Sequence, residues 1–167
     1  MTNEGGARYL VVNGRRWRRE DPSIPATLAS ELRSELMSAR RAVLAAQRAR
    51  DAGALRSARR RVQNAKVALG ERGTPWWTDW NARSETARTE RATATIRALL
   101  RHRAEGKTIC PSDVARANAG ESWRAAMPAI RDVVEKLAAK GEIEVLQRGK
   151  KVDPKRARGP IRIRTPG

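Results

Sequence analysis

The order of the elements predicted for residues 108–164 constrains the fold of this chain most. A short helix is expected to begin at Cys110-Pro111-Ser112-Asp113, because proline needs no N–H at the first helical position and the Asp113 carboxylate suits the positive end of a helix. A second helix, predicted over residues 128–140, is ended by Gly141. Two strands of alternating residues are predicted to follow, at 142–145 and 161–164. We take this order as that of a scaffold that docks on nucleic acid.

The loop between the two predicted strands is strongly basic. Its cations share the loop with a single acid, Asp153, and are Arg148, Lys150, Lys151, Lys155, Arg156 and Arg158. We expect them to contact phosphates, while Arg124 and Arg131 would contact base edges. The second helix is expected to be nearly neutral outside, because two opposite charges are spaced for i,i+4 ion pairs: Arg131 with Glu135, and Asp132 with Lys136. We therefore expect the phosphate contacts that position the protein on a polyanion to be stronger than the base contacts that would read a sequence.

The composition also favours a polyanionic partner. The chain has 36 Lys and Arg against 18 Asp and Glu, a formal charge of +18 and a pI of about 11.6, with the basic excess present in both halves. The 40% hydrophobic content falls at periodic positions and supports folding rather than disorder. One cysteine excludes an intrachain disulfide, and the chain shows neither an apolar run of membrane-spanning length nor a secretory signal. We therefore expect a cytoplasmic location.

The first half predicts a β-hairpin and then a pair of antiparallel helices. Asn13-Gly14 favours a tight turn between two short strands, whose apolar face (Tyr9, Val11 and Trp17) is expected to lie on the helices. A helix is predicted from Ala26 to about Arg48, where Asp51-Ala52-Gly53 interrupts the apolar pattern. A second apolar stripe runs from Leu55 to Leu69. Two helices cannot close a core, so the third partner is either the hairpin or a second copy of the chain.

The outer faces of these helices are rich in arginine. The stretch from Arg56 to Lys66 contains no acid and includes Arg59, Arg60 and Arg61. Ordinary surface helices mix the two signs of charge, so this face is either a solvated surface or a phosphate-binding surface, with equal support for each. Arginine can grip phosphate through two hydrogen bonds, which would suit RNA or DNA.

The junction of the two halves is marked by Trp76, Trp77 and Trp80. The cluster is either a platform for unpaired bases or, as we favour, packing material, because the chain has no phenylalanine. Residues 81–83 would form the linker. The next helix is predicted over residues 84–102, with one apolar side and four arginines outside: Arg88, Arg91, Arg97 and Arg101. Thr108-Ile109 is expected to form a short strand before Cys110.

Enzymatic chemistry has little support in this sequence, and we predict no cofactor and no metal. His102, the single histidine, lies near a helix end, where a structural or surface role is favoured over catalysis. Cys110 at a helix N-terminus is a candidate redox sensor, but the role of a small buried N-capping residue is favoured. Glu142 and Glu144 share a strand face and are expected to face Arg162 and Arg164 across the hairpin.

Several segments of the second half resemble a known bacterial family. Thr108 to Arg116, Trp123-Arg124, Met127-Pro128, Gly141-Glu142-Ile143 and Arg158-Gly159-Pro160-Ile161-Arg162 together are similar to a bacterial winged-helix domain family of unknown function. The first half, through Leu36-Met37, residues 39–43, residues 66–73 and Trp76-Trp77, resembles small uncharacterised bacterial proteins sometimes labelled biopolymer transporter Tol. The resemblance implies a winged helix over the last half and brings no established activity.

The expected fold is mainly α with small β-hairpins, in two parts. Residues 1–80 would form a β-hairpin and a basic helical hairpin, and residues 84–167 a C-terminal winged helix-turn-helix. The expected function is non-enzymatic binding of double-stranded DNA, mainly at phosphates, and transcriptional regulation is one role that fits it. The alternatives are a protein-protein docking module and an RNA- or ribosome-associated basic protein. No membrane or small-molecule partner is expected, and a homodimer is compatible with the pattern.

Overall fold

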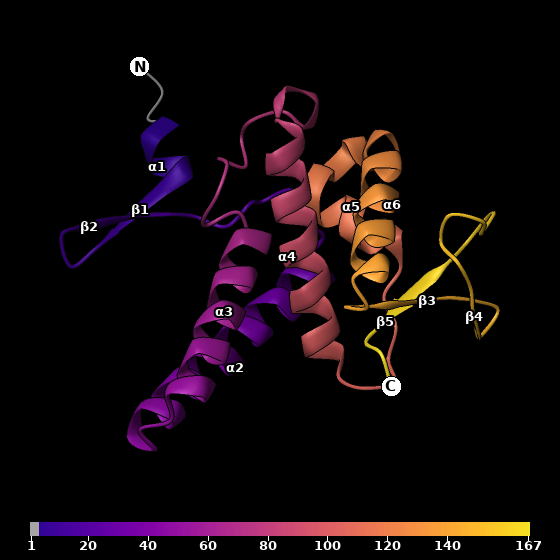
Figure 1. The fold of residues 1–167 in the computed structure, drawn as a ribbon. Coiled ribbons are helices and arrows are strands. Elements are labelled where there is room, and N and C mark those ends of the chain that lie inside the picture. Colours follow the sequence, from indigo (N-terminus) through magenta and orange to yellow (C-terminus); the bar gives the residue numbers. More distant parts are fainter. Residues whose placement is uncertain (1–3) are drawn as a thin grey trace.

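The computed structural model describes residues 4–167, which are mainly helical with two small antiparallel sheets (Figure 1). The predicted fold class, mainly α with small β-hairpins, is thereby confirmed. In chain order the elements are α1 (Glu4–Arg8), β1 (Tyr9–Val12), β2 (Arg15–Arg18), α2 (Ala26–Arg48), α3 (Ala52–Ala68), η1 (Trp80–Ala82), α4 (Glu85–Arg103), α5 (Pro111–Ala119), η2 (Gly120–Ser122), α6 (Trp123–Ala139), β3 (Glu144–Gln147), β4 (Lys150–Lys151) and β5 (Arg162–Arg164).

The N-terminal hairpin forms at the predicted turn, but its two faces differ from the prediction. Asn13 and Gly14 both have positive φ angles, 49° and 73°, as a two-residue hairpin turn requires. Trp17 pairs with Leu10, so it lies on the face opposite to Tyr9 and Val11, and the prediction of one shared apolar face is wrong. Tyr9 meets the Trp77 ring edge-on at 5.6 Å, and the Lys66 ammonium lies 5.1 Å from the Trp17 ring.

Helices α2 and α3 pair as predicted, and their third partner is α4. Helix α2 starts after Pro25, whose fixed geometry precedes the first turn. The Asp51 carboxylate accepts a hydrogen bond from Ala54 N and so caps α3, which includes Ala52 and Gly53. Both helices pack on α4, whereas we had expected the hairpin or a second copy to close this core. A helix from the second half of the chain therefore completes the first half.

One hydrophobic core runs through both halves of the chain. It includes Leu32 of α2, Leu69 after α3, Ile96 of α4 and Ile130 of α6, all with no exposed surface. Figure 1 shows α4 between the α2–α3 pair and the α5–α6 pair, and it packs on each of these helices. Contact between the halves is thus extensive. The division of the chain into residues 1–80 and 84–167 stays a prediction.

The junction between the halves is packed and hydrogen-bonded. Trp80 is 6% exposed, and the Trp76 indole donates to Arg19 O at 3.0 Å, so the tryptophans serve as packing. Arg83, placed in the predicted linker, is buried, and its guanidinium donates to the carbonyls of Trp76, Thr78 and Asn118. The predicted linker is therefore a fixed part of the structure.

A buried ion pair joins the segment before α2 to α4. Arg91 was expected outside, but it is 5% exposed because the central helix α4 is covered on most of its sides. Arg91 Nη2 donates to Asp21 Oδ2 at 2.7 Å and to the carbonyls of Ala68 and Ala117. Asp21 also bonds Leu69 O through its backbone N at 2.8 Å and accepts from Ser23 through Oδ1. Four parts of the chain meet at this pair.

The second half begins its helix α5 as predicted and departs from the prediction after it. Asp113 accepts from Cys110 N at 3.2 Å, which completes the predicted cap. Helix α6 begins at Trp123 rather than at Pro128, which lies inside the helix. Strand β3 begins at Glu144 rather than Glu142, because Glu142 N bonds Leu137 O and so belongs to the end of α6.

The C-terminal sheet has the order β4-β3-β5, and Ile109 extends it. Ile109 and Ile163 exchange both backbone hydrogen bonds at 2.9 Å, so the short strand expected at Thr108-Ile109 is present only as a single-residue β-bridge. Strand β4, at Lys150–Lys151, lies in the segment expected to be loop. Among residues 4–167, no helix combines the length and apolar character needed to cross a membrane.

We predict that Asp21→Asn destabilises the protein by about 3–5 kcal/mol, because it leaves the buried Arg91 guanidinium without its counter-charge. The matched control is Glu20→Gln, which breaks the more exposed pair with Arg33 and should cost less than about 1 kcal/mol. Urea denaturation monitored by circular dichroism measures both. Equal midpoints for the two variants would show that the buried pair does not stabilise the fold.

Candidate nucleic-acid interface

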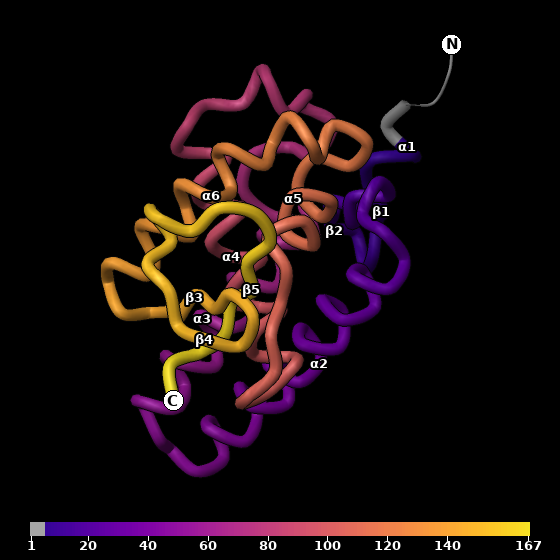
Figure 2. Tube along the Cα trace, turned by 90° about the vertical axis from the view of Figure 1, so that its right-hand side faces the viewer, coloured from indigo at the N-terminus to yellow at the C-terminus, as the bar shows by residue number. Residues whose placement is uncertain are grey.

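The residues predicted to contact nucleic acid lie on two separate parts of the molecule. Residues 148–158, here called the basic loop, stand with β3–β5 on one side of the helices, and the arginines of α2 and α3 lie away from them (Figures 1 and 2). Arg124 and Arg131 belong to α6, and Arg131 donates a hydrogen bond to Gly159 O, directly after the basic loop. The structure therefore brings Arg131 to the basic loop and leaves Arg59, Arg60 and Arg61 apart.

The basic loop is tied to the sheet while its cations face solvent. Arg148 and Gly149 turn the chain with φ angles of 51° and 79°, so that Lys150 pairs with Gln147. The Gln147 side-chain amide donates to the carbonyls of Arg158 and Pro160, which fixes the returning chain. The exposed side chains are those predicted for phosphate contact: Arg148, Lys150, Lys151, Lys155, Arg156 and Arg158.

Some of these cations already have acidic partners. Lys151 Nζ lies 2.9 Å from Glu144 Oε1, and Arg164 Nη2 lies 2.8 Å from Glu144 Oε2. Hydrogen bonds from Lys151 and then Arg164 hold the pKa of the Glu144 carboxyl below its ordinary value. Arg156 approaches Asp153 only to 3.9 Å. Lys150 has no acidic partner within the described residues, so it is freer than Lys151 to bind an anion.

The acids of β3 only partly follow the prediction. Glu144 faces Arg164 across the hairpin, as expected. Glu142 instead pairs with Arg97 of α4 at 2.7 Å, because it lies outside the strand at the end of α6.

Helix α6 uses its charged residues differently from the prediction. Arg131 donates to Gly159 O at 2.7 Å, and Lys136 lies 3.4 Å from Glu85. Both replace the expected pairs with Glu135 and Asp132. Arg131 therefore braces the basic loop, which leaves the helix with an outer surface of mixed charge.

Arg124 is held at the N-terminal end of α6 by an aromatic ring. Its guanidinium lies 4.5 Å from the centre of the Trp123 ring, and that of Arg116 lies 4.3 Å from the same ring. Arg124 is exposed, so the stacked guanidinium keeps its N–H edges available to an external acceptor. Among the predicted base-contacting residues, Arg124 is the better placed.

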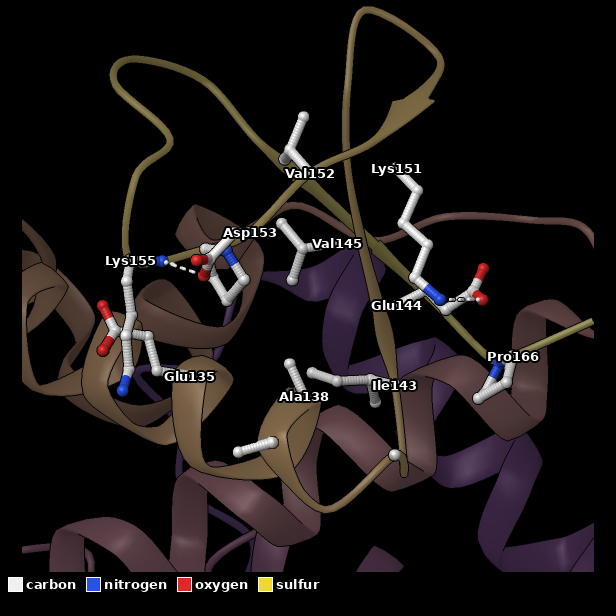
Figure 3. A pocket seen from close by; sticks show the side chains of 13 residues that line it. Glu135, Ala138, Ile143, Glu144, Val145, Lys151, Val152, Asp153, Lys155 and Pro166 are labelled. Carbon is white, nitrogen blue, oxygen red and sulfur yellow. Dashed lines mark hydrogen bonds and ion pairs between the residues drawn. The ribbon is translucent and has the colours of Figure 1, made fainter.

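A groove of about 590 Å³ separates α6 from the basic loop (Figure 3). Its apolar lining includes Ala138, Ile143, Val145 and Val152. Three acids also line it: Glu135, Glu144 and Asp153. Lys151 and Lys155 line it as well, so the groove carries charges of both signs.

The arginines of α2 and α3 divide into structural and free residues. Arg61 donates to both Glu35 oxygens, at 2.7 and 3.0 Å, and to Ser38 Oγ. The hydrogen bond from Arg61 to Glu35 raises the pKa of Arg61. We therefore remove Arg61 from the candidate nucleic-acid contacts. Arg59 and Arg60 are exposed, as are Arg40, Arg41, Arg48, Arg50 and Arg56.

Sequence reasoning missed a buried cationic cluster behind the junction. Burial and the nearby charge of Arg91 lower the pKa of Arg83 to about 10. Asn118 is 1% exposed and donates to Thr95 Oγ1 and Val114 O. The neighbouring Trp76-Trp77 and Asp79 gave no signal that distinguishes a buried arginine from a surface one. The hydrogen bonds of Arg83 and Asn118 all go to groups of the protein itself, so these residues stabilise the fold.

The other singled-out residues, Cys110 and His102, lie at the ends of helices. Cys110 is partly buried at the N-terminus of α5 and accepts a hydrogen bond from Ser112 Oγ at 3.0 Å. His102 is exposed in the last turn of α4. Within the part of the chain that the structure describes, no three His, Cys, Asp or Glu residues gather as metal ligands would.

A family model described as "Protein of unknown function (DUF3253)" matches residues 89–166. The match begins inside α4 and covers α5, α6 and the sheet of β3–β5. It supports the expected likeness of the second half to a family without an assigned function. No curated protein matches the chain.

We predict that the Glu144 carboxyl titrates below its ordinary pKa of 4.5 and that Lys151→Gln raises this pKa, because the substitution removes its strongest hydrogen-bond donor. A lowered folded-state pKa stabilises the fold above the ordinary value, and this contribution is lost as the pH falls through the folded-state value. Carboxyl NMR across pH 2–6 measures both proteins. Identical titration curves would mean that Lys151 does not pair with Glu144 in solution.

Proposed function

We propose that residues 84–167 form a winged helix and that the protein binds double-stranded DNA, mainly through phosphate contacts of the basic loop. The supporting order is α4, the Ile109 bridge to β5, α5, α6, β3, the basic loop and β5. In this arrangement α6 is the recognition helix and the basic loop is the wing. The proposal is non-enzymatic, and a cytoplasmic transcriptional regulator is the role that it fits.

The observation that carries the proposal is the exposed set of cations on the braced basic loop. Gln147 and Arg131 hold the loop through backbone carbonyls, so its position is fixed before any ligand binds. Lys150, Lys155 and Arg158 then present their charges to solvent. A preorganised row of cations can contact successive phosphates without a further loss of loop entropy.

The surface of α6 favours positioning over sequence reading. Arg124 is free to contact a base edge, but Arg131 is partly buried and bonded to Gly159 O. Exposed Asp132 and partly exposed Glu135 would repel phosphates close to the helix. We therefore expect modest preference among duplex sequences and a strong dependence on salt.

The test is fluorescence anisotropy of labelled duplex DNA across a salt series. Each phosphate contact contributes about −0.9 to the slope of log K against log salt, so Lys150→Gln with Lys155→Gln should flatten the slope by about 1.8. The matched control is Lys107→Gln with Lys140→Gln, because both lysines are exposed and lie outside the loop. An effect of equal size in the control would reduce the binding to a general property of net charge.

RNA binding through α3 is the alternative that Arg59 and Arg60 support, since both are exposed. Arg59→Gln with Arg60→Gln should then weaken binding to structured RNA and leave duplex DNA binding unchanged. A protein that prefers RNA and responds only to this pair would replace the DNA proposal.

Protein docking is the alternative that the groove beside α6 supports. Its apolar lining could hold side chains of a partner, and the mixed charge of α6 resembles a protein-binding surface. If the protein binds none of the nucleic acids near physiological salt, this alternative is favoured.

A further inference from the structure

The β1–β2 hairpin projects from the helical body and carries an uncompensated positive charge (Figure 1). Residues 7–19 include no acid and contain five arginines: Arg8, Arg15, Arg16, Arg18 and Arg19. A two-stranded hairpin is marginally stable in water, so a projecting one has to be held by its base. The basic loop does not explain this positively charged, projecting hairpin, which therefore needs an explanation of its own.

The base of the hairpin is clamped to the rest of the protein. Arg18 Nη1 donates to Gly73 O at 2.8 Å, and Tyr9 packs edge-on against Trp77. Arg19 N bonds Arg8 O at 2.9 Å and closes the base of the two strands. These contacts orient the hairpin without covering its tip.

The tip is free and has the same composition on both faces. Val11 pairs with Arg16, and Val12 pairs with Arg15, so each face presents one valine and one arginine. All four side chains are exposed, with Val11 at 70% and Val12 at 49%. The valines contribute nothing to the core of this chain, which leaves them available for contact with a partner.

Aromatic rings position the two tip arginines. The Arg16 guanidinium lies 4.3 Å from the centre of the Tyr9 ring, and that of Arg15 lies 5.3 Å from the Trp17 ring. Stacking restricts a guanidinium while its N–H edges can still donate to a phosphate or a guanine. The tip therefore combines fixed cations with small apolar side chains.

We propose that this hairpin is a β-ribbon that enters the major groove of duplex DNA, an inference that rests on the proposed DNA binding. Strands about 4.8 Å apart fit a groove about 12 Å wide, whereas the minor groove, about 6 Å wide, is too narrow for a ribbon with side chains. Arg15 and Arg16 contact the phosphates that flank the groove, and Val11 and Val12 contact thymine methyl groups or sugars. Because no acid within residues 7–19 balances these arginines, the hairpin favours a polyanionic partner.

The hairpin and the basic loop lie on opposite sides of the helices. Figure 1 shows β1 and β2 at the left and β3 and β4 at the right, and Figure 2 is viewed from the side of the basic loop. Helices α4, α5 and α6 stand between them in Figure 1. The two elements therefore contact different DNA segments, and one protein molecule holds two segments together.

The first test compares Arg15→Gln with Arg16→Gln against a control of the same charge, Arg101→Gln with Lys107→Gln, both exposed at the end of α4 and beyond. The hairpin variant should flatten the salt slope on duplex DNA by about 1.8. It should leave duplex RNA unaffected, because the major groove of A-form RNA is too deep and narrow for side chains to read. Arg15→Lys with Arg16→Lys keeps the charge and should retain most of the slope.

The outcomes separate this inference from the proposed function. An unchanged slope in the hairpin variant, with the basic-loop variant still impaired, overturns the ribbon and leaves the proposed function standing. An equal loss on duplex RNA also overturns groove entry. A wild-type protein that binds no duplex overturns both. Circular dichroism of each variant establishes that it is folded before it is compared.

The second test measures whether one protein molecule joins two duplexes. Bead-bound duplex DNA is incubated with the protein and a second, labelled duplex, and the captured label is counted. The wild type should capture it, whereas Arg15→Gln with Arg16→Gln should lose capture and still bind a single duplex through the basic loop. Retained capture in this variant, as a dimer with two basic loops would give, overturns the inference.

Discussion

The ion pair of Asp21 and Arg91 organises the contact between the two halves of the chain. Arg91 projects from α4 and donates to Asp21 and to the carbonyls of Ala68 in α3 and Ala117 in α5. Asp21 N donates to Leu69 O. Gly70 permits this closeness: its φ is +79°, and a side chain there would come within 3.2 Å of Asp21 Cβ. A hydrophobic core alone would not fix the angle at which α4 meets α3, whereas directed hydrogen bonds to a buried guanidinium do.

The high arginine content serves two purposes that composition cannot separate. Arg61, Arg83, Arg91 and Arg103 are bound to acids or carbonyls of the protein itself, and they hold helices and loops in place. Three groups of exposed cations lie at the basic loop, on α2 and α3, and on the N-terminal hairpin. The formal charge of +18 is therefore larger than the charge on any one of the three exposed groups. These groups also differ in how firmly their backbone is held.

Local signals predicted the parts of the fold that local chemistry determines. Asn13-Gly14 indicated the hairpin, Pro25 and the leucine spacing indicated α2, and Cys110 to Asp113 indicated the start of α5, all at the observed positions. The failures required tertiary knowledge. Arg91 has the same local pattern as the outer arginines of α4, and only the coverage of that helix buries it. Glu142 lies in an alternating pattern typical of a strand. Its backbone N nevertheless donates to Leu137 O, which places it in the turn that ends α6. For the candidate site, the basic loop was found from its composition, whereas the bonds of Arg61 to Glu35 and of Lys151 to Glu144 were not.

The burial of Arg91 also limits which fragment of this protein can be cut out and still fold. Arg91 lies within the segment that matches the family model, and Asp21 lies outside it. A fragment cut at the edges of that match would begin within α4 and carry a guanidinium whose counter-charge had been left behind. A stretch of similar sequence and a self-sufficient folding unit thus have different boundaries in this chain. Any chain that carries the matched segment with an arginine at this place must supply an acid, a water-filled space or a different packing partner of its own.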